Sequence, residues 1–292
     1  MATDDALLKL GLPKGHMREE VFALLRDAGI RVRDADRNYR PVTSLDHADA
    51  KMMKPQNIIG MLEGGSRDVG FAGADWVEEL DADLVELLDT GLDPVRVVAA
   101  APEDLVADSA DLSAVDRPVV VASEYENITR DWIDRTGLDA RYVRSFGATE
   151  AFPPEDADCI VDNSATGRTL EANHLAVVDV LMESSTRLYT TEDVLDDPDK
   201  ASVIDEFVLL LESVLEARDR VMLEVNVAEE KLEEVVDVLP CMREPTIASL
   251  SHGSGYAVKV AMSRSELPTV IPAVEARGGT DVVVTSPSHI VT

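Results

Sequence analysis

The sequence has no apolar run of the roughly 18 residues that a membrane-spanning helix requires. Its start, MATDDALLKLGLPKG, also lacks the basic segment and apolar run that are typical of a secretory signal. Only two cysteines are present, Cys159 and Cys241, and neither lies in the CxxC motif or Cys/His cluster of a zinc site. We therefore expect a cytoplasmic protein with free thiols and no membrane partner.

Basic residues are also scarce. Lys and Arg number 27 against 57 Asp and Glu, which gives a formal net charge of −30. The acids are spread over nearly all segments, so the chain would repel nucleic acid and anionic membranes. We interpret this excess as the surface of a halophilic protein, because high salt shortens the Debye length to a few Å and screens the self-repulsion. A local pocket for an anion remains compatible with such a surface.

The pattern of apolar segments predicts an α/β fold. The chain has 292 residues, 45% of them hydrophobic, which is enough for two or three domains. Short apolar runs predict buried strands, and the helical segments between them indicate a mostly parallel sheet. The predicted strands are 7–12, 68–73, 95–101 and 118–122, and the predicted helices include 19–28 and 128–135.

The rhythm of the sequence changes after a long helix predicted over 201–218. The order beyond it is strand, helix, strand, strand, helix, strand, which is the βαββαβ pattern of ferredoxin-like modules. A domain boundary near residue 218 follows. The successive segments are 221–227, 229–239, 246–250, 256–261, 267–276 and 281–285.

The segment IVDNSATGRTLEAN, residues 160–173, carries the clearest chemical pattern. A strand ends at Asp162, at the sheet edge where α/β proteins hold ligands. The turn from Ser164 to Thr169 offers backbone N–H groups and hydroxyls, and a helix predicted from about Leu170 adds its positive end. Together they suit a phosphate monoester, with Asp162 accepting hydrogen bonds from ribose. The alternative is that the hydroxyls only cap a helix.

Several segments resemble, in the same order, the signatures of the ATP phosphoribosyltransferase family. Asp158–Asp162 matches the family's Asp-Ala-Ile-Val-Asp strand, and Ala165–Leu170 matches its Ser-Thr-Gly-x-Thr-Leu turn. Gly147–Glu150 matches Gly-[Ser/Ala]-x-Glu. The resemblance runs nearly end to end and includes the C-terminal regulatory domain of the family's long form. Further matching segments are Leu12–Gly15, Asp68–Asp75 and Glu183–Leu188.

This resemblance implies a two-lobed, periplasmic-binding-protein-like catalytic core followed by a ferredoxin-like regulatory domain. The implied reaction transfers phosphoribosyl from phosphoribosyl pyrophosphate to N1 of ATP and releases pyrophosphate, as the first step of histidine biosynthesis. Mg²⁺ is the implied cofactor, because it neutralises pyrophosphate. The implied domains are 1–98 with 183–217 (catalytic domain I), 99–182 (catalytic domain II) and 218–292 (regulatory domain).

The resemblance also implies roles for individual residues, whereas the Mg²⁺ ligands stay open. Asp162 and Glu150 would hold the ribose and stabilise positive charge at its anomeric carbon. Phosphoribosyl pyrophosphate would be bound by Asp158, Ser164, Ala165, Thr166, Gly167, Arg168 and Thr169. The nucleotide or pyrophosphate would be bound by Lys14, His16, Lys54, Gly73, Asp75 and Arg96. Without the resemblance, the lone basic residues would be interpreted as solvated side chains.

The regulatory domain implies histidine as a feedback inhibitor, with Asn226 and Thr246 beside the effector. The family often has Asp where Asn226 stands, and the alternative is that Asn226 is a surface amide at a strand end. Family members form dimers and hexamers, so the resemblance implies a homo-oligomer.

The first domain departs from the family in three segments. Lys14–Met17 replaces Lys-Gly-Arg-Leu, Lys54–Ile59 replaces Arg-x-x-Asp-Ile-Pro, and Asp93–Val97 keeps only the arginine of Gly-x-Cys-Arg-Leu. Arg and Lys are not equivalent at a bidentate anion site. Two alternatives therefore stay open: a phosphoribosyltransferase with a different acceptor, and a non-catalytic ligand-binding or regulatory relative.

Overall fold

The computed structural model describes residues 8–35, 38–46, 48–106, 112 and 115–292. These residues form two compact units. The first consists of the described residues up to Ala23 and of Ile30–Asp205, and the second of Leu24–Gly29 and Glu206–Thr292. Leu7, the first residue of the first predicted strand, lies outside the described residues.

The first unit is built on one eight-stranded sheet with the order β4-β1-β5-β10-β6-β9-β7-β8. Strands β4, β1 and β5 form one end of the sheet, and strands β9, β7 and β8 form the other. Within each end the strands pair in parallel. The bounds are β1 Leu8–Pro13, β4 Ala48–Met53, β5 Val69–Gly73, β6 Val85–Pro102, β7 Val119–Ser123, β8 Ala140–Arg144, β9 Cys159–Ser164 and β10 Leu175–Thr190.

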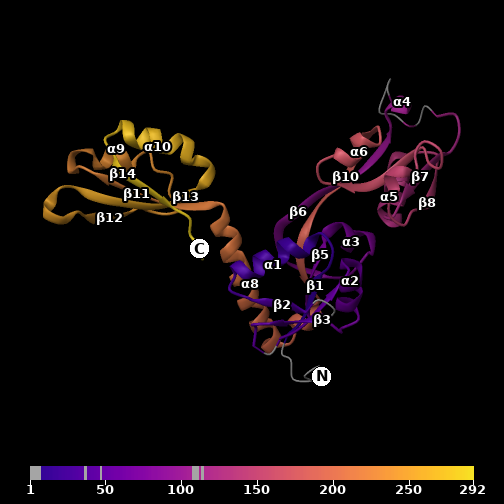
Figure 1. The fold of residues 1–292 in the computed structure, drawn as a ribbon, viewed down its shortest axis with the longest axis horizontal. Helices are drawn as coiled ribbons and strands as arrows, with labels where there is room; N and C mark the ends of the chain where they lie inside the picture. The colour runs from indigo at the N-terminus through magenta and orange to yellow at the C-terminus, as the bar shows by residue number, and fades with distance from the viewer. Residues whose placement is uncertain (1–7, 36–37, 47, 107–111, 113–114) are drawn as a thin grey trace. The chain divides into compact units, whose positions relative to one another are not determined.

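Two long antiparallel strands, β6 and β10, lie in the middle of the sheet. Along their length they connect two lobes of the unit (Figure 1). Lobe I carries β1, β4 and β5, and lobe II carries β7, β8 and β9. This arrangement confirms the predicted two-lobed core. The expectation of a mostly parallel sheet was wrong at the centre, because β10 is antiparallel to β5 and to β6, and β6 is antiparallel to β9.

Strand β6 is much longer than the predicted strand over 95–101, since it spans 18 residues. The sequence Asp93-Pro94 reads as a break, and Gly91 and Asp93 do have positive φ values. The β6–β10 pairing nevertheless continues through this point with shifts of register near Ser184 and Thr186. The Thr90 hydroxyl donates a hydrogen bond to the Thr186 carbonyl oxygen at 2.5 Å, which helps to hold the irregular stretch together.

Helices cover the sheet with apolar faces. In lobe I, Ile58, Ile59 and Leu62 of one helix are fully buried, and in lobe II Trp132 packs with strand residues such as Val121. A hairpin of β2 (Val32–Ala35) and β3 (Asn38–Thr43) forms a separate two-stranded sheet. The helices are α1 Met17–Asp27, α2 Pro55–Glu63, α3 Ala74–Glu79, α4 Glu103–Val106, α5 Glu126–Thr136, α6 Arg168–Ala172 and α7 Glu192–Leu195.

Helix α8 (Pro198–Arg218) leads into the second unit, whose sheet has the order β12-β13-β11-β14 and is antiparallel throughout. With its two helices this is the predicted ferredoxin-like module. Side chains of β11 alternate, so that Val221, Leu223 and Val225 are buried under the helices. The elements are β11 Arg220–Val227, α9 Leu232–Val236, β12 Thr246–Ser249, β13 Tyr256–Ser263, α10 Leu267–Ala276 and β14 Thr280–Thr285.

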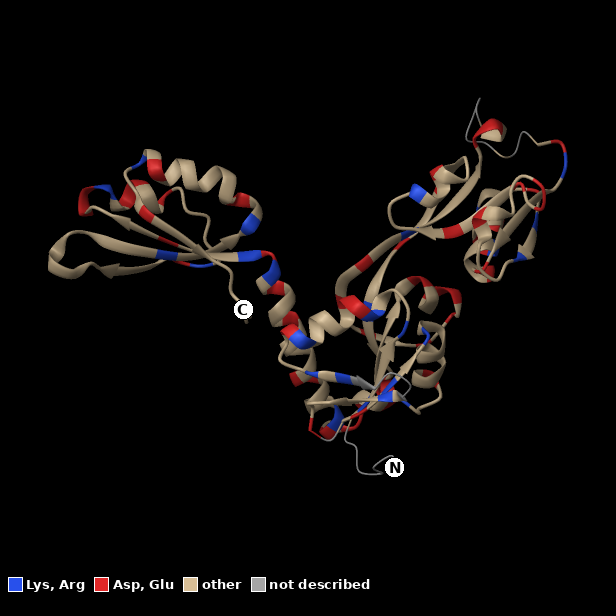
Figure 2. Ribbon diagram, viewed as in Figure 1, with Lys and Arg blue, Asp and Glu red and all other residues tan. Residues whose placement is uncertain are grey.

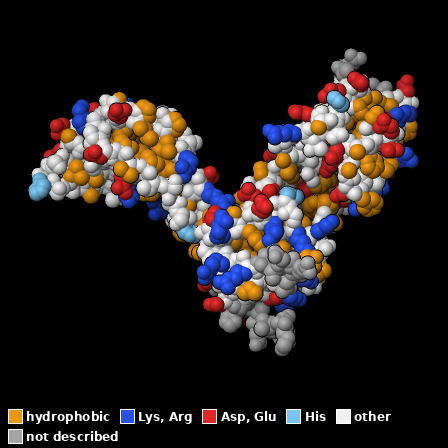
Figure 3. Space-filling view, in the orientation of Figure 1, with side chains coloured by type: hydrophobic (Ala, Val, Ile, Leu, Met, Phe, Trp, Pro, Cys, Tyr) orange, Lys and Arg blue, Asp and Glu red, His pale blue; other side chains and the backbone are white. Residues whose placement is uncertain are grey.

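The surface is as acidic as the composition predicts. Figure 2 shows Asp and Glu on elements of both units, outnumbering Lys and Arg. In Figure 3, several Lys and Arg side chains nevertheless gather on the visible face of lobe I. Within the described part of the chain, no helix is long and apolar enough to cross a membrane.

Candidate active site

Asp162 lies near the end of β9 with its side chain only partly exposed. Its Oδ1 accepts a hydrogen bond from the backbone N–H of Asn163 at 2.7 Å. Burial is the main cause that raises the pKa of the Asp162 carboxyl to about 6, with a contribution from the nearby negative charges of Glu150 and Glu124 and against hydrogen bonds that lower it. A carboxylate held under such repulsion is suited to bind a group that carries positive charge.

Glu150 reaches this position through an unusual backbone. Gly147 and Ala148 both have positive φ values, 89° and 48°, and a 3₁₀ turn over Thr149–Ala151 follows. Glycine adopts such a φ without strain, whereas alanine does so rarely. The Ser145 and Thr149 hydroxyls, 2.8 Å apart, fix the turn. This turn contacts β9, and Glu150 lies near enough to Asp162 for its negative charge to raise the Asp162 pKa, so the two predicted catalytic residues belong to the same region.

The turn after β9 is mostly exposed. Gly167 has a φ of 78°, and its N–H donates to the Ser164 Oγ at 3.1 Å. Ala165, Thr166 and Thr169 are exposed, as is the Arg168 side chain. Helix α6 has only five residues, so its dipole contributes less than predicted. Anion binding here would rest on the N–H groups, hydroxyls and Arg168.

Asp158 does not belong to this turn. It precedes the first residue of β9, so about six residues at roughly 3.3 Å each separate it from the turn. Its carboxylate accepts two hydrogen bonds of 2.6 Å from the Arg117 guanidinium and one of 2.8 Å from the Val120 N–H. The prediction that Asp158 binds phosphoribosyl pyrophosphate is therefore corrected: its side chain ties β9 to β7.

Asp158→Asn is expected to lower the free energy of unfolding by about 1 kcal/mol and to leave ligand affinity unchanged. The Arg117 hydrogen bonds hold the pKa of the Asp158 carboxyl below its usual value, so this stability is present at neutral pH and is lost as the pH falls through the lowered pKa. Urea denaturation and phosphoribosyl pyrophosphate titration check the two statements. A large loss of affinity for phosphoribosyl pyrophosphate would show that Asp158 does take part in binding it.

A cavity of about 310 Å³ lies in lobe I at the carboxyl ends of β1 and β5. Asn163, which directly follows Asp162, also lines it, and so do Ser184–Thr186 of β10. The structure therefore brings most of the predicted nucleotide or pyrophosphate residues to one cavity beside β9. The predicted residues in its lining are Lys14, His16, Lys54, Gly73 and Asp75.

The first turn of α2 forms part of the cavity wall through Lys54, Pro55 and Gln56. Helix α2 has nine residues, Lys54 as its N-cap, and no acid in its first turn. Its positive end is therefore not neutralised by its own side chains, and Lys54 adds a full charge. This helix end, rather than α6, is the one that favours an anion.

Asp75 acts as a hub inside the cavity wall rather than as an open ligand group. Its side chain is 5% exposed. Its two carboxylate oxygens accept hydrogen bonds from the Tyr125 hydroxyl (2.6 Å) and the Ser184 hydroxyl (2.7 Å). The Tyr125 oxygen in turn accepts from the Asn163 amide at 2.8 Å. A β-carbon at Gly73 would lie 2.2 Å from the Asp75 Oδ1, which explains the glycine there.

Tyr125 and Asn163 belong to the hydrogen-bond network of the candidate site, and the sequence interpretation named neither of them. Burial, followed by the adjacent Asp75 carboxylate, raises the pKa of Tyr125, so its hydroxyl stays protonated and can donate. Their places in the sequence could have indicated them. Tyr125 follows the carboxyl end of β7 and Asn163 lies near that of β9, and such strand ends are where α/β proteins bind ligands.

Arg96 lies outside the lobe I cavity. It is paired in register with Ser164 across β6 and β9, and it lines a neighbouring cavity of about 430 Å³ together with Ala165. Both cavities share Val95, Ser184 and Ser185. Arg96 is therefore placed beside the turn 164–169 and not in the cavity that Lys14 lines, although the prediction grouped the two residues.

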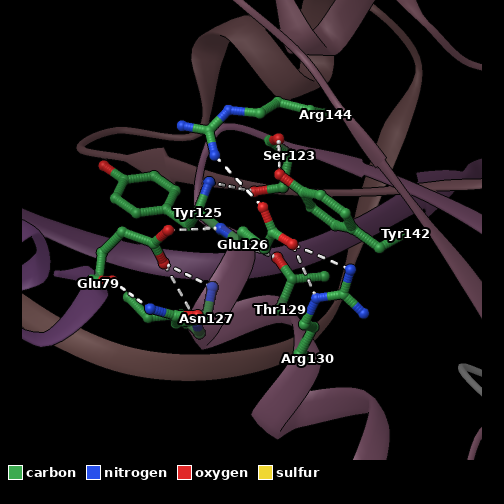
Figure 4. A network of polar contacts seen from close by, with 10 residues as sticks. Glu79, Ser123, Tyr125, Glu126, Asn127, Thr129, Arg130, Tyr142 and Arg144 are labelled. Carbon is green, nitrogen blue, oxygen red and sulfur yellow. Dashed lines mark hydrogen bonds and ion pairs between the residues drawn. The ribbon is translucent and has the colours of Figure 1, made fainter. Parts of the chain in front are cut away.

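A polar network joins the two lobes at α3 and α5 (Figure 4). The buried Glu79 carboxylate at the end of α3 accepts hydrogen bonds from the backbone N–H groups of Glu126 (2.6 Å), Asn127 (3.0 Å) and Ile128 (3.1 Å). The Asn127 amide donates back to the Glu79 carbonyl oxygen at 2.7 Å. One side chain from lobe I thus caps a helix of lobe II.

In the second unit, the two predicted effector residues are not neighbours. Thr246 is on the edge strand β12 and pairs in register with Lys259 of β13, whereas Asn226 is on β11 and pairs with Ala257. The Asn226 amide donates to the Asp281 carboxylate at 3.1 Å. Thr246 lines a cavity that does not include Asn226. Within one chain they do not form a single site.

Among the described residues, no group of three or more His, Cys, Asp or Glu side chains is arranged to hold a metal ion. In lobe II, the carboxylates of Glu150 and Glu124 lie close enough to Asp162 for their charges to raise its pKa. Mg²⁺ commonly uses one or two carboxylates together with substrate phosphates. Asp162 and Glu150 could supply the protein ligands of such a site, and substrate phosphates would complete the coordination.

Comparison with known proteins agrees with this geometry. The ATP phosphoribosyltransferase family model matches residues 54–213, and the model of the HisG C-terminal domain matches residues 217–287. ATP phosphoribosyltransferase of Chlorobium phaeovibrioides is 34% identical over 284 residues, which are 95% of each chain. The enzyme of Pelotomaculum thermopropionicum is 32% identical over 282 residues, covering 94% of this chain and 96% of its own.

A solved structure shares the fold. The ATP phosphoribosyl transferase (HisG:HisZ) complex from Thermotoga maritima superposes with a TM-score of 0.62 at 24% identity, over 72% of this chain and 98% of the other. With the two-lobed core, the motif at Asp162 and the ferredoxin-like unit, these matches place the chain in the ATP phosphoribosyltransferase family, the enzymes that begin histidine biosynthesis.

Proposed function

We propose that Asp162 and Glu150 serve the family's reaction, in which phosphoribosyl passes from phosphoribosyl pyrophosphate to N1 of ATP. The observation that carries the proposal is their pairing beside the turn 164–169, with a raised Asp162 pKa. The bond from the anomeric carbon to pyrophosphate breaks, and pyrophosphate leaves with the electron pair. Adenine N1 supplies the pair for the new bond and needs no base.

The two carboxylates act on the charge that develops in this transfer. Positive charge builds on the ribose as the leaving group departs, and fixed negative groups stabilise it. Both side chains can also accept hydrogen bonds from ribose hydroxyls, which orients the sugar for attack. The turn with Gly167 and Arg168 would hold the 5-phosphate, with Arg96 alongside.

The lobe I cavity would receive the phosphate chain of a substrate. Lys14, Lys54 and the uncapped end of α2 supply positive charge there, against an overall acidic surface. Asn163 connects this cavity to Asp162, so the two substrates would meet at the end of β9.

Mg²⁺ fits the proposed site as a partner that arrives with the substrate. The pair Asp162 and Glu150 would hold it, and the remaining ligands would be phosphate oxygens and water. When bound, the ion neutralises the departing pyrophosphate. The protein side chains would then orient the ribose and the phosphates and stabilise the positive charge on the sugar.

The regulatory role of the second unit belongs to the same proposal. The ferredoxin-like module would bind histidine in a cytoplasmic homo-oligomer, and Asn226 of one subunit and Thr246 of another would contact one effector. Their separation in one chain across β13 supports that arrangement.

Incubation with ATP, phosphoribosyl pyrophosphate and Mg²⁺ tests the function. We expect phosphoribosyl-ATP by mass spectrometry and one pyrophosphate per product, with activity rising several-fold from low to molar KCl as the charge of −30 is screened. EDTA should stop the reaction and histidine should slow it. If ligand binds but ATP gives no product, the changes at His16, Lys54 and Asn57 have altered the acceptor, and other nucleobases are tested next.

A further inference from the structure

We propose that Tyr39 is a positioning residue for Lys14, and that its ring holds the ammonium group at the lobe I cavity for a pyrophosphate-type anion. The inference rests on the proposed function for the identity of that anion. The shared chemistry is a chain of phosphates, which either ATP or phosphoribosyl pyrophosphate can bring.

The geometry is that of a cation over an aromatic face. The Lys14 Nζ lies 3.2 Å from the centroid of the Tyr39 ring. The Tyr39 side chain is 61% exposed, so the ring does not serve the core, and Lys14 lines the cavity. The Lys14 backbone is itself fixed, because its N–H donates to the Met53 carbonyl oxygen at 2.9 Å.

The hairpin that carries Tyr39 is anchored to the sheet of lobe I. The Arg40 guanidinium, on the next residue, donates to both Asp49 carboxylate oxygens at 3.1 and 3.2 Å. Asp49 belongs to β4, which pairs in parallel with β1, and β1 ends just before Lys14. This ion pair and the contact of β3 with β4 hold the strand that carries Tyr39 next to the strands that lead to Lys14.

Fixing the ammonium has a consequence for anion binding. A free lysine side chain loses much rotational freedom when it binds a ligand. The ring occupies one side of the ammonium and leaves N–H donors for phosphate oxygens. Part of the conformational entropy of the Lys14 side chain is thus already lost before the ligand binds. If the ring instead withheld Lys14 from the ligand, its removal would strengthen binding, so the sign of the effect decides.

The test compares inorganic pyrophosphate binding, by calorimetry, among the full-length wild type, Tyr39→Phe, Tyr39→Leu and Val42→Ala. We expect the Leu variant to bind roughly 3- to 10-fold more weakly, and the Phe variant within about twofold of wild type, because Phe keeps the aromatic face. Val42 is 68% exposed on the same strand, and its variant controls for a general effect on the hairpin.

Separate KM values for the two substrates identify the anion. A higher KM for ATP alone in Tyr39→Leu assigns Lys14 to the triphosphate, and a higher KM for phosphoribosyl pyrophosphate alone assigns it to that ligand. Unchanged or tighter pyrophosphate binding by the Leu variant overturns the inference, as does a Phe variant as weak as the Leu variant. If wild type yields no product while pyrophosphate binding still depends on the ring, the proposed function fails and the role of Tyr39 stands.

Discussion

Asp162→Asn is expected to abolish turnover and, at the same time, to make the folded chain more stable at pH 7. Loss of the charge that faces the ribose should reduce kcat by about 10³-fold. The stabilisation follows from the pKa of Asp162, which folding raises from 3.8 to about 6. At 1.36 kcal/mol per unit, keeping this group ionised costs the fold up to about 3 kcal/mol, and asparagine avoids that cost.

The dependence on pH has a definite sign. The folded chain holds the Asp162 proton more tightly than the unfolded chain does, so stability falls as the pH rises from about 4 to about 6, and the full cost is present above that. The difference in stability between wild type and Asp162→Asn should therefore be present at pH 7 and shrink towards pH 4. Activity of the wild type should fall below about pH 6, where the carboxyl becomes protonated.

Urea denaturation at several pH values and single-turnover assays measure both effects. Asp158→Asn is the matched control, because Asp158 lies at the other end of the same strand and should lose stability while keeping activity. Near-normal turnover by Asp162→Asn would remove Asp162 from the catalytic site.

Glu79→Ala is expected to cause the largest loss of stability, about 2–3 kcal/mol. The substitution leaves three backbone N–H groups at the start of α5 without their acceptor. Burial raises the pKa of Glu79 despite these bonds, which shows that little water reaches the carboxylate, and unpaired N–H groups at such a place are costly. Activity should fall as well, because α5 follows directly after Tyr125.

Denaturation midpoints measure this effect against two comparisons. Glu78→Ala alters an exposed neighbour of the same charge and should change stability by less than about 0.5 kcal/mol. Glu79→Gln keeps one acceptor oxygen and should lie between wild type and Glu79→Ala. Equal stability of all three variants would show that the cap contributes nothing to the contact between the lobes.

Local patterns predicted much of this fold. Helix α10 follows the predicted 267–276, and β5 and β11 lie within a residue of their predicted segments, because apolar periodicity and turn residues agree there. Glu150 also lies near enough to Asp162 to raise its pKa, as expected if the two motifs face one site. In the tail the strand and helix patterns alternate clearly, so the order of its elements could be predicted, although β11 pairs with the distant strands β13 and β14.

Contacts between distant segments account for the rest. Asp75 meets Tyr125 across 50 residues and Ser184 across 109, and no local pattern encodes such distances. Asp158 and Asp162 belong to one motif, but the motif does not show that Asp158 pairs with Arg117, which is 41 residues away in the sequence. The hairpin of β2 and β3 was not predicted, because its strands are short and lack clear alternation.

The irregular pairing of β6 and β10 determines how the core can bend. Both strands continue from lobe I to lobe II, and their register slips near Ser184 and Thr186, opposite Leu92 and Val95. Where the pairing is irregular, fewer backbone hydrogen bonds join the two strands, so they bend more easily there than along their regular parts. Ser184 and Ser185 at this level border both cavities. We therefore expect flexure of the ribbon to reshape both compartments together, so that filling one changes the room left in the other.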